Sequence, residues 1–323
     1  MKNSIIVLLA ILPLFGFTQN GKIIVNNPAK METKDRITLF DSSGNAYSYP
    51  KKDWGEKILP EELKKVWDNP DNLYGLLVMS LREGFDHELI EGGLRLKSID
   101  KDKDRAYTVL GIIYVRSNEL KKAEQTLLEG IRLSNNPAVL KTNLAKVYYD
   151  QGLKEKGYAT LWEAIELDPN QDNAVLWIGA INRDQGGKEE YLRIMKKIAE
   201  LPSSWRAQLW IARDYLDNYD VESAIKIYQD ILPKVKNEEG AMMMISGDLG
   251  QHGLEEEVMS MVYPLYDISN QDYKTGLNII NACIKTRNKA VGIKVLNEIK
   301  LLNRYDLTAY LINLENMLNQ IAE

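Results

Sequence analysis

The hydrophobic and polar positions of this chain repeat over two neighbouring stretches. Residues 106–131 read AYTVLGIIYVRSNELKKAEQTLLEGI, and residues 140–165 read LKTNLAKVYYDQGLKEKGYATLWEAI. In both stretches apolar residues return every three or four positions, which predicts two amphipathic helices joined by a short turn. With the second stretch placed 34 residues after the first, like residues share positions: Leu110 and Leu144, Gly111 and Ala145, Tyr114 and Tyr148, and Leu127 and Leu161.

The same spacing, continued in both directions, predicts seven units between about Pro70 and Asp306. Their starts fall near residues 70, 104, 138, 172, 205, 239 and 273, and such a period is typical of stacked helical pairs. In the other units the small-residue position is held by Leu77, Gly179, Ala212, Ser246 and Ile280. Glycine marks the turn between the helices of several units, because helix ends often need a left-handed residue: Gly84, Gly152, Gly186 and Gly253.

The order of residues within a unit resembles the tetratricopeptide repeat (TPR) family. In that family an apolar, a small and an aromatic residue follow one another along the first helix, as Leu144, Ala145 and Tyr148 do here. A small residue recurs in the second helix, and a proline often closes the repeat, as Pro169 does in ELDPN. The resemblance implies an all-α solenoid, a right-handed superhelix of helix–turn–helix repeats. In such proteins the first helices line a concave groove that binds partner proteins.

Both ends of the predicted array differ from the repeats. Residues 307–323 predict a C-terminal capping helix, whose apolar face would cover the last repeat: Leu307, Tyr310, Leu311, Leu314, Met317, Leu318 and Ile321. Residues 19–69 predict a small N-terminal cap with short strands at KIIV, RITLF and AYSY, the last two joined by a hairpin turn at DSSGN. A helix is expected to start near Pro60. A partly ordered linker is the alternative for this segment.

The first residues have the pattern of a secretory signal peptide. Lys2 supplies a positive charge, an apolar run extends from Ile5 to Phe17, and polar residues follow from Thr18. Such a run is too short to cross a bilayer as a helix, so we expect residues 1–18 to be removed, with cleavage after Thr18 or Gln19. The alternative is an uncleaved N-terminal anchor. The leader is similar to bacterial ones, and the expected location is the periplasm or the exterior of the cell.

Composition narrows the class of protein. Hydrophobic residues make up 45% of the chain, which suffices for a large core, and no later segment is apolar over the length of a membrane span. The net charge of −5 argues against nucleic-acid binding, which depends on lysine and arginine neutralising phosphates. Cys283 is the only cysteine, so no intramolecular disulfide can form and no cysteine near the leader could carry a lipid.

Catalytic and metal-binding motifs fail on their spacing. HGLEE at residues 252–256 lacks the second histidine of a zinc-protease helix, and the other histidine of the chain is His87. The acidic run that starts at Asp100 lacks the glycine and the closing glutamate of a calcium-binding loop, so we interpret it as a solvated helix start. We therefore expect no metal, no cofactor and no catalytic site.

The helix that contains LAKVYYDQG has two different faces. Leu144 and Tyr148 lie on one stripe, whereas Lys146, Tyr149 and Asp150 lie on another. The first stripe predicts packing, which leaves Tyr149 to contact a partner. By register, the resemblance to TPR proteins places these residues along the groove: Arg82, Arg116, Thr142, Lys146, Tyr149, Asp150, Asn173, Arg183, Asp184, Arg206, Arg213, Asp217 and Asn281.

The predicted groove is basic, although the chain as a whole is acidic. A guanidinium pairs with a carboxylate through two hydrogen bonds and an aromatic ring offers flat apolar area, so the groove favours an acidic peptide or protein. The alternative is that long arginines only solvate helix faces. Some TPR grooves clamp a chaperone's C-terminal carboxylate with a lysine–asparagine set. Asn143 matches that set, but four other places do not: Thr108, Ile112, Asn173 and Trp177.

Together these patterns favour a non-catalytic protein-interaction scaffold of the bacterial cell envelope, with the partner bound along the groove. One alternative is a structural component that self-assembles through its convex face or an end repeat. An envelope enzyme is a further alternative, and it would need carboxylates that the superhelix brings together. An RNA-binding helical repeat is disfavoured by the acidic charge.

Overall fold

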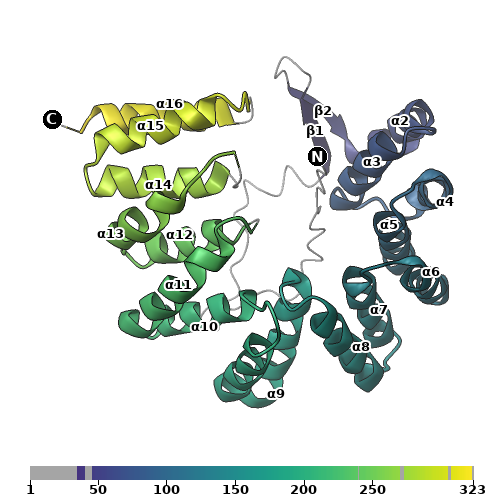
Figure 1. The fold of residues 1–323 in the computed structure, drawn as a ribbon. Helices are drawn as coiled ribbons and strands as arrows, with labels where there is room; N and C mark the ends of the chain where they lie inside the picture. Colours follow the sequence, from purple (N-terminus) through teal and green to yellow (C-terminus); the bar gives the residue numbers. More distant parts are fainter. Residues whose placement is uncertain (1–34, 41–45, 239, 270–272, 305–306, 322–323) are drawn as a thin grey trace. The chain divides into compact units, whose positions relative to one another are not determined.

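The computed structural model describes residues 35–40, 46–238, 240–269, 273–304 and 307–321. The predicted leader and the predicted strand KIIV lie outside these residues. The chain forms two compact units, one up to Ile178 and one from Gly179 onward. The expected all-α fold with a small β-containing N-terminal part is confirmed, since helices follow one another along both units and the described sheet has two strands (Figure 1).

The described part of the first unit begins with a β-hairpin that leads directly into a helix. The elements are β1 (Arg36–Phe40), antiparallel to β2 (Ala46–Pro50), then α1 (Lys51–Asp53), η2 (Trp54–Ile58) and α2 (Leu59–Val66). α2 starts at Leu59, next to Pro60 as predicted, but helical turns that were not predicted precede it without a break from Lys51. In the π-helical turn η2 the Leu59 N–H donates to the Trp54 carbonyl oxygen, and this wider turn lets the helix pass Pro60, which has no N–H to donate.

Helices stack side by side through the rest of the first unit. They are α3 (Pro70–Arg82), η3 (His87–Leu89), α4 (Ile90–Ile99), α5 (Lys103–Arg116), α6 (Leu120–Leu133), α7 (Ala138–Asp150), α8 (Lys154–Leu167) and the beginning of α9 (Asp172–Ala199). The closest pairs are α5 with α6 and α7 with α8. In addition α3 contacts α5, and α5 contacts α7, so the first helices of neighbouring pairs are themselves adjacent (Figure 1).

The second unit continues the helical pattern. After the end of α9 come α10 (Arg206–Asp217), α11 (Val221–Val235), α12 (Ala241–Gln251), α13 (Glu255–Glu257), η4 (Val258–Val262), η5 (Tyr263–Leu265), α14 (Tyr273–Lys285), α15 (Lys289–Lys300) and α16 (Thr308–Asn319). α9 loses helical geometry at Gly186 and Gly187, so it consists of two helices joined by a turn. Here too the first helices are adjacent, since α10 contacts α12 and α12 contacts α14.

A residue with positive φ closes the turn inside successive helix pairs. Among the glycines expected there, Gly186 lies in the turn as predicted, but its φ is −140° and the left-handed residue is its neighbour Gly187, with φ 67°. Glycine adopts positive φ without steric strain, which explains its use at these turns. The residues in this place are Gly84, Asn118, Gly152, Gly187, Tyr219, Gly253 and Arg287.

The predicted packing stripe forms the core. Leu110, Leu144 and Tyr148 are 1%, 4% and 3% exposed. Close approach of α5 and α6 depends on Gly111, where an added Cβ would lie 2.6 Å from a methyl carbon of Leu127. The small residue in the repeated pattern therefore serves helix contact, as the sequence indicates.

α16 covers the end of the second unit through a narrower face than predicted. Leu311, Leu314 and Leu318 are buried, and α16 contacts α14 and α15. Tyr310 and Met317, predicted to lie in the same buried face, are 42% and 40% exposed. A helix that packs on one layer buries a stripe of about 100°, so residues at the edges of the apolar face remain in solvent.

Candidate functional site

In the first unit the candidate site is the surface shared by the first helices. It consists of the exposed and half-buried side chains of α3, α5, α7 and the part of α9 up to Ile178, and we call it the first-helix surface. α3, α5 and α7 contact one another in turn, and Tyr149 of α7 contacts Trp177 of α9. Side chains on the common face of these helices therefore form one surface.

Tyr149 lies on the first-helix surface and is half-buried, whereas its neighbour Tyr148 lies in the core. The Tyr149 and Trp177 rings have centroids 5.0 Å apart and planes tilted by 52°. Tyr149 also covers Gly157 of α8, where an added Cβ would be 2.5 Å from ring carbon Cδ2. The two rings together form an aromatic patch whose members come from neighbouring first helices. Sequence reasoning identified Tyr149 as a contact residue, but it named Trp177 only as a position that does not match the carboxylate-clamp set.

The other predicted residues of α7 are less available to a partner. Thr142 is 5% exposed, and its hydroxyl donates to the Ala138 carbonyl 2.9 Å away. The expectation that Thr142 contacts a partner is therefore wrong, because the threonine side chain bonds to the preceding turn of its own helix. Lys146 forms an ion pair with Asp150, one turn further along.

The two predicted arginines of the first unit differ in their surroundings. The Arg116 guanidinium donates to the Leu81 carbonyl 2.6 Å away and pairs with Asp86, with Nε 2.7 Å from the carboxylate oxygen. Arg82 is exposed, and among the described residues it has no hydrogen bond or ion pair. Of these two cations, only Arg82 is ready to pair with a carboxylate from outside.

Arg105 is a residue of this surface that sequence reasoning missed. Its guanidinium donates to Asp71 of α3 over 2.6 Å and to Asp100 over 2.6 Å, and it lies 5.0 Å from the Tyr74 ring centroid. Asp100 is 2% exposed, so interpreting it as solvated was wrong, because Arg105 compensates its buried charge. The 34-residue separation of Asp71 and Arg105 puts them at the same position in adjacent units, which is the signal that could have shown the contact.

In the second unit the corresponding surface, on α10, α12 and α14, contains a buried acid. Asp248 of α12 is 2% exposed, and its Oδ1 accepts from Arg213 Nε at 2.9 Å. The Tyr228 hydroxyl donates to the other carboxylate oxygen at 3.0 Å. His252 Nδ1 donates to the Asp248 carbonyl at 2.8 Å, and its Nε2 lies 3.2 Å from Asp217.

Burial dominates the electrostatics of this cluster. It raises the pKa of the Asp248 carboxyl, against the opposing effect of the Arg213 guanidinium and of the Tyr228 hydroxyl. Burial likewise raises the pKa of Tyr228, and the adjacent Asp248 carboxylate raises it further. Arg213 is thus held as the counter-ion of a buried carboxylate, and its other side faces the Trp210 ring at 4.3 Å. Arg213, which we predicted as a partner contact, instead links α10 to α12 through its ion pair with Asp248.

The remaining predicted residues of the second unit have mixed surroundings. Arg183 stacks over the Tyr191 ring, 4.0 Å from its centroid. Arg206 lies 4.6 Å from the Trp205 ring centroid and 3.3 Å from the Met244 sulfur. In the first unit Asn173 is half-buried. The exposed members of the predicted set in the second unit are Arg183, Asp184, Asp217 and Asn281.

These contacts correct the expectation of a strongly basic groove. Three of the cations counted toward it are paired with carboxylates from the same chain: Arg116 with Asp86, Lys146 with Asp150, and Arg213 with Asp248. An ion pair presents little net charge to a partner, because each charge screens the other at short range. The local charge therefore rests on fewer side chains than the sequence indicates.

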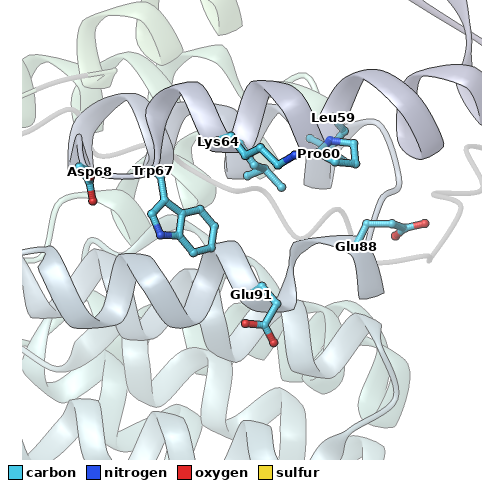
Figure 2. A pocket seen from close by; sticks show the side chains of 8 residues that line it. Leu59, Pro60, Lys64, Trp67, Asp68, Glu88 and Glu91 are labelled. Atoms are coloured by element: carbon cyan, nitrogen blue, oxygen red, sulfur yellow. The ribbon is translucent and has the colours of Figure 1, made fainter.

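An open hollow in the first unit was not predicted. It has a volume of about 530 Å³ and lies between α2 and the segment of η3 and α4. Figure 2 shows the Trp67 indole extending from α2 toward the helix that carries Glu91, with Glu88 on the same side as Glu91. Leu59, Pro60 and Leu63 add apolar lining. The hollow combines an aromatic wall with an acidic edge. The tryptophan in KKVWDNP was the sequence feature that could have indicated it.

The described residues contain no group of three or more His, Cys, Asp or Glu side chains placed to hold a metal ion. Within the same part of the chain, no helix has the length and apolar character needed to cross a bilayer. The side chains of both surfaces offer rings, guanidinium groups and carboxylates, which suit recognition of another polypeptide.

Comparison with known proteins agrees with the repeat pattern. Residues 104–137 match the tetratricopeptide repeat family model. TPR repeat-containing protein YpiA of Bacillus subtilis is 24% identical over 213 residues, which is 64% of this chain and 50% of that protein. The chain therefore contains a tetratricopeptide repeat at residues 104–137 and is similar to a TPR repeat-containing protein over a longer stretch. It spans about half the length of the curated relative that it matches.

Solved structures of similar proteins show low overall agreement. MamA is 22% identical, with a TM-score of 0.36 over 46% of this chain and 92% of that chain. A tetratricopeptide repeat protein from Parabacteroides merdae is 14% identical, with a TM-score of 0.37 over 81% and 99%. PilF of Pseudomonas aeruginosa is 15% identical, with a TM-score of 0.36 over 67% and 97%. At these TM-scores the likenesses carry no argument, and the fold rests on the chain's own helices.

Proposed function

We propose that the chain is a non-catalytic scaffold of the bacterial cell envelope that binds a segment of a partner protein on the first-helix surface of the first unit. The observation that carries this proposal is the half-buried aromatic pair of Tyr149 and Trp177 on that surface. Tyrosine and tryptophan are the residues that most often dominate the binding energy of protein interfaces. TPR proteins typically act as scaffolds of this kind, so the proposal contains no chemical step.

The partner segment in this proposal combines apolar side chains with carboxylates. Val139, at the start of α7, is 38% exposed and adds apolar surface to the same helix as Tyr149. Arg82 has no ion pair among the described residues, so a partner carboxylate can form a bidentate pair with it. Charge then sets the register of the segment, while the rings supply most of the affinity.

The test is capture of the partner by a tagged full-length chain, with crosslinking in cells, affinity purification and mass spectrometry. The surface variant carries Arg82→Glu and Val139→Glu. Its matched control carries Arg132→Glu and Leu128→Glu on α6, where Leu128 is 37% exposed, close to the 38% of Val139. All four side chains are exposed, so both variants are expected to fold.

We expect a protein that the wild type captures to fall at least about tenfold with the surface variant, the loss that about 1.4 kcal/mol produces, and to stay unchanged with the α6 control. A partner retained by both variants, or lost from both, would contradict recognition by the first-helix surface. Arg213 is left unchanged in these variants, because its removal would leave the buried carboxylate of Asp248 without its counter-ion and destabilise the second unit.

Location in the envelope is the second part of the proposal, and the N-terminal pattern of a signal peptide supports it. We expect the mature chain to begin after Thr18 or Gln19, because a signal peptidase removes the leader after export. Mass spectrometry of the N-terminal peptide, together with cell fractionation, measures this. A chain that retains residues 1–18 and fractionates with the cytosol would contradict export, whereas retention in the membrane fraction would indicate an uncleaved anchor.

A further inference from the structure

The hollow between α2 and the segment of η3 and α4 has two chemically different sides. The Trp67 indole extends from α2 toward the helix that carries Glu91, and Glu88 lies on the same side as Glu91 (Figure 2). Trp67 is half-buried, and its indole N–H has no hydrogen-bond partner in the described part of the chain. Leu59 and Leu63 are buried and add apolar lining. The volume of about 530 Å³ lies within the range of roughly 300–1,000 Å³ that is typical of ligand pockets.

The local charge of this hollow is negative. Glu88 and Glu91 are exposed, and neither carboxylate has an ion pair within the described residues. The N-terminus of α4 carries about +0.5 of an elementary charge, which offsets only part of the charge of two carboxylates. The other charged residues of the lining are each neutralised by a partner from the same chain: Lys64 by Glu61, and Asp68 by Arg95.

Two other places in the chain show which side chain a ring and a carboxylate hold together. Arg213 lies 4.3 Å from the Trp210 ring centroid, and its guanidinium is 2.7 Å from the Asp248 carboxylate. Arg105 lies 5.0 Å from the Tyr74 ring centroid and is paired with two aspartates. A planar guanidinium can stack on a ring with its face and donate to a carboxylate with its edge. Among the described residues, no arginine lines the hollow, so its ring and carboxylates are available to one from outside.

We infer that the hollow binds an arginine side chain in a segment of a partner protein. The guanidinium stacks on the Trp67 ring and pairs with the carboxylates of Glu88 and Glu91. A backbone carbonyl of the segment accepts from the free indole N–H, and an apolar neighbour of the arginine covers the buried leucines. These last two contacts favour a polypeptide over a small organic cation. The site lies on other helices than the first-helix surface and selects the opposite charge, so the inference is independent of the proposed function.

The test uses the full chain, labelled with ¹⁵N, and a tripeptide of arginine between two leucines, acetylated and amidated at its ends. Titration to about 10 mM peptide is followed by nuclear magnetic resonance, through the Trp67 indole signal and the backbone amides of residues 88–91. We expect a dissociation constant on the order of 1 mM, because exposed ion pairs and one ring contact each contribute little. Citrulline in place of arginine removes the charge and keeps the shape, and it should weaken binding at least about tenfold. Lysine should weaken it about threefold, because an ammonium cannot stack.

Variants of the chain separate the two walls of the hollow. Glu88→Gln combined with Glu91→Gln removes both charges at nearly constant size, and we expect the dissociation constant to rise at least about fivefold. The matched control combines Glu155→Gln with Glu189→Gln, which changes the net charge equally. Both of these glutamates are exposed and have no ion pair within the described residues, so binding should stay unchanged. Trp67→Leu keeps an apolar side chain but removes the ring, and it should weaken binding about threefold or more.

Several results would overturn the inference. The first is equal binding of the arginine and citrulline peptides, or of the arginine and lysine peptides. The second is an equal loss with the control pair of glutamines, which would reduce the effect to overall charge. Tighter binding of tetramethylammonium than of the arginine peptide would assign the hollow to small organic cations instead. If Trp67→Leu alters folding, the Glu88 and Glu91 variant decides the case, because both side chains are exposed.

Discussion

Replacing Gly130 by alanine is expected to lower the free energy of unfolding of the first unit by about 2 kcal/mol, although alanine is the better helix former. An added Cβ on Gly130 of α6 would lie 2.6 Å from Tyr107 Cβ and 3.2 Å from Leu140 Cδ2. The Tyr107 Cβ is bonded to the backbone of α5, so no rotamer change relieves the clash and the helices must move apart. Urea unfolding followed by circular dichroism measures the loss.

Gly75→Ala is the matched control for this prediction. Gly75 is an exposed residue inside α3, and an added Cβ would meet no atom within 4 Å. The same substitution should therefore raise the free energy of unfolding by about 0.5–1 kcal/mol, because alanine loses less backbone entropy than glycine in a helix. Hydrogen exchange should become faster around α5, α6 and α7 with Gly130→Ala only. Stabilisation by both substitutions would contradict the close contact of α5 and α6.

Replacing Asp248 by alanine should destabilise the second unit by about 3 kcal/mol. The carboxylate is nearly fully buried, and it accepts from the Arg213 guanidinium and the Tyr228 hydroxyl. Its removal leaves the partly buried cation without a counter-ion and the buried hydroxyl without an acceptor, and both cost free energy. Urea unfolding, with hydrogen exchange resolved to α10, α11 and α12, measures the effect.

Two further variants serve as comparisons: one removes an exposed carboxylate, and the other removes the charge of Asp248 but keeps a hydrogen-bond acceptor. Asp217→Ala removes an exposed carboxylate 3.2 Å from His252, and we expect a change below about 1 kcal/mol. Asp248→Asn keeps an acceptor for Arg213 but removes the negative charge, so its effect should fall between the two alanine variants. If Asp248→Ala were as mild as Asp217→Ala, the cluster would not hold α10 against α12.

Local sequence pattern predicted the helices well where the pattern was strong. The stripe of Leu110 and Tyr114 in α5, and of Leu144 and Tyr148 in α7, lies in the core as expected. Helix formation and the choice of a buried face depend mainly on residues within one or two turns, and those are visible in the sequence. The start of α2 beside Pro60 was predicted, but the helical turns from Lys51 that precede it were missed, because a π-helical turn has no clear pattern in the sequence.

The candidate site was predictable only in part. Its residues could be placed on first helices by register, but Thr142 proved buried and Arg213 proved to be tied to Asp248. Arg213 and Asp248 are 35 residues apart, on helices whose facing side chains the repeat pattern alone does not pair. The Tyr149–Trp177 contact also joins two helices, so it could not be predicted from the residues that flank either one in the sequence.

The sequence by itself determined the helical class of this protein, the repeat spacing and the stripe that packs in the core. These follow from periodicity, glycine at turns and apolar content, all of which act over a few residues. Only the tertiary structure decided which arginines are paired, which aromatic rings meet and which side of α16 stays exposed. Side-chain packing and ion pairing act only between groups a few ångströms apart. They therefore depend on which neighbouring helix supplies the facing side chains.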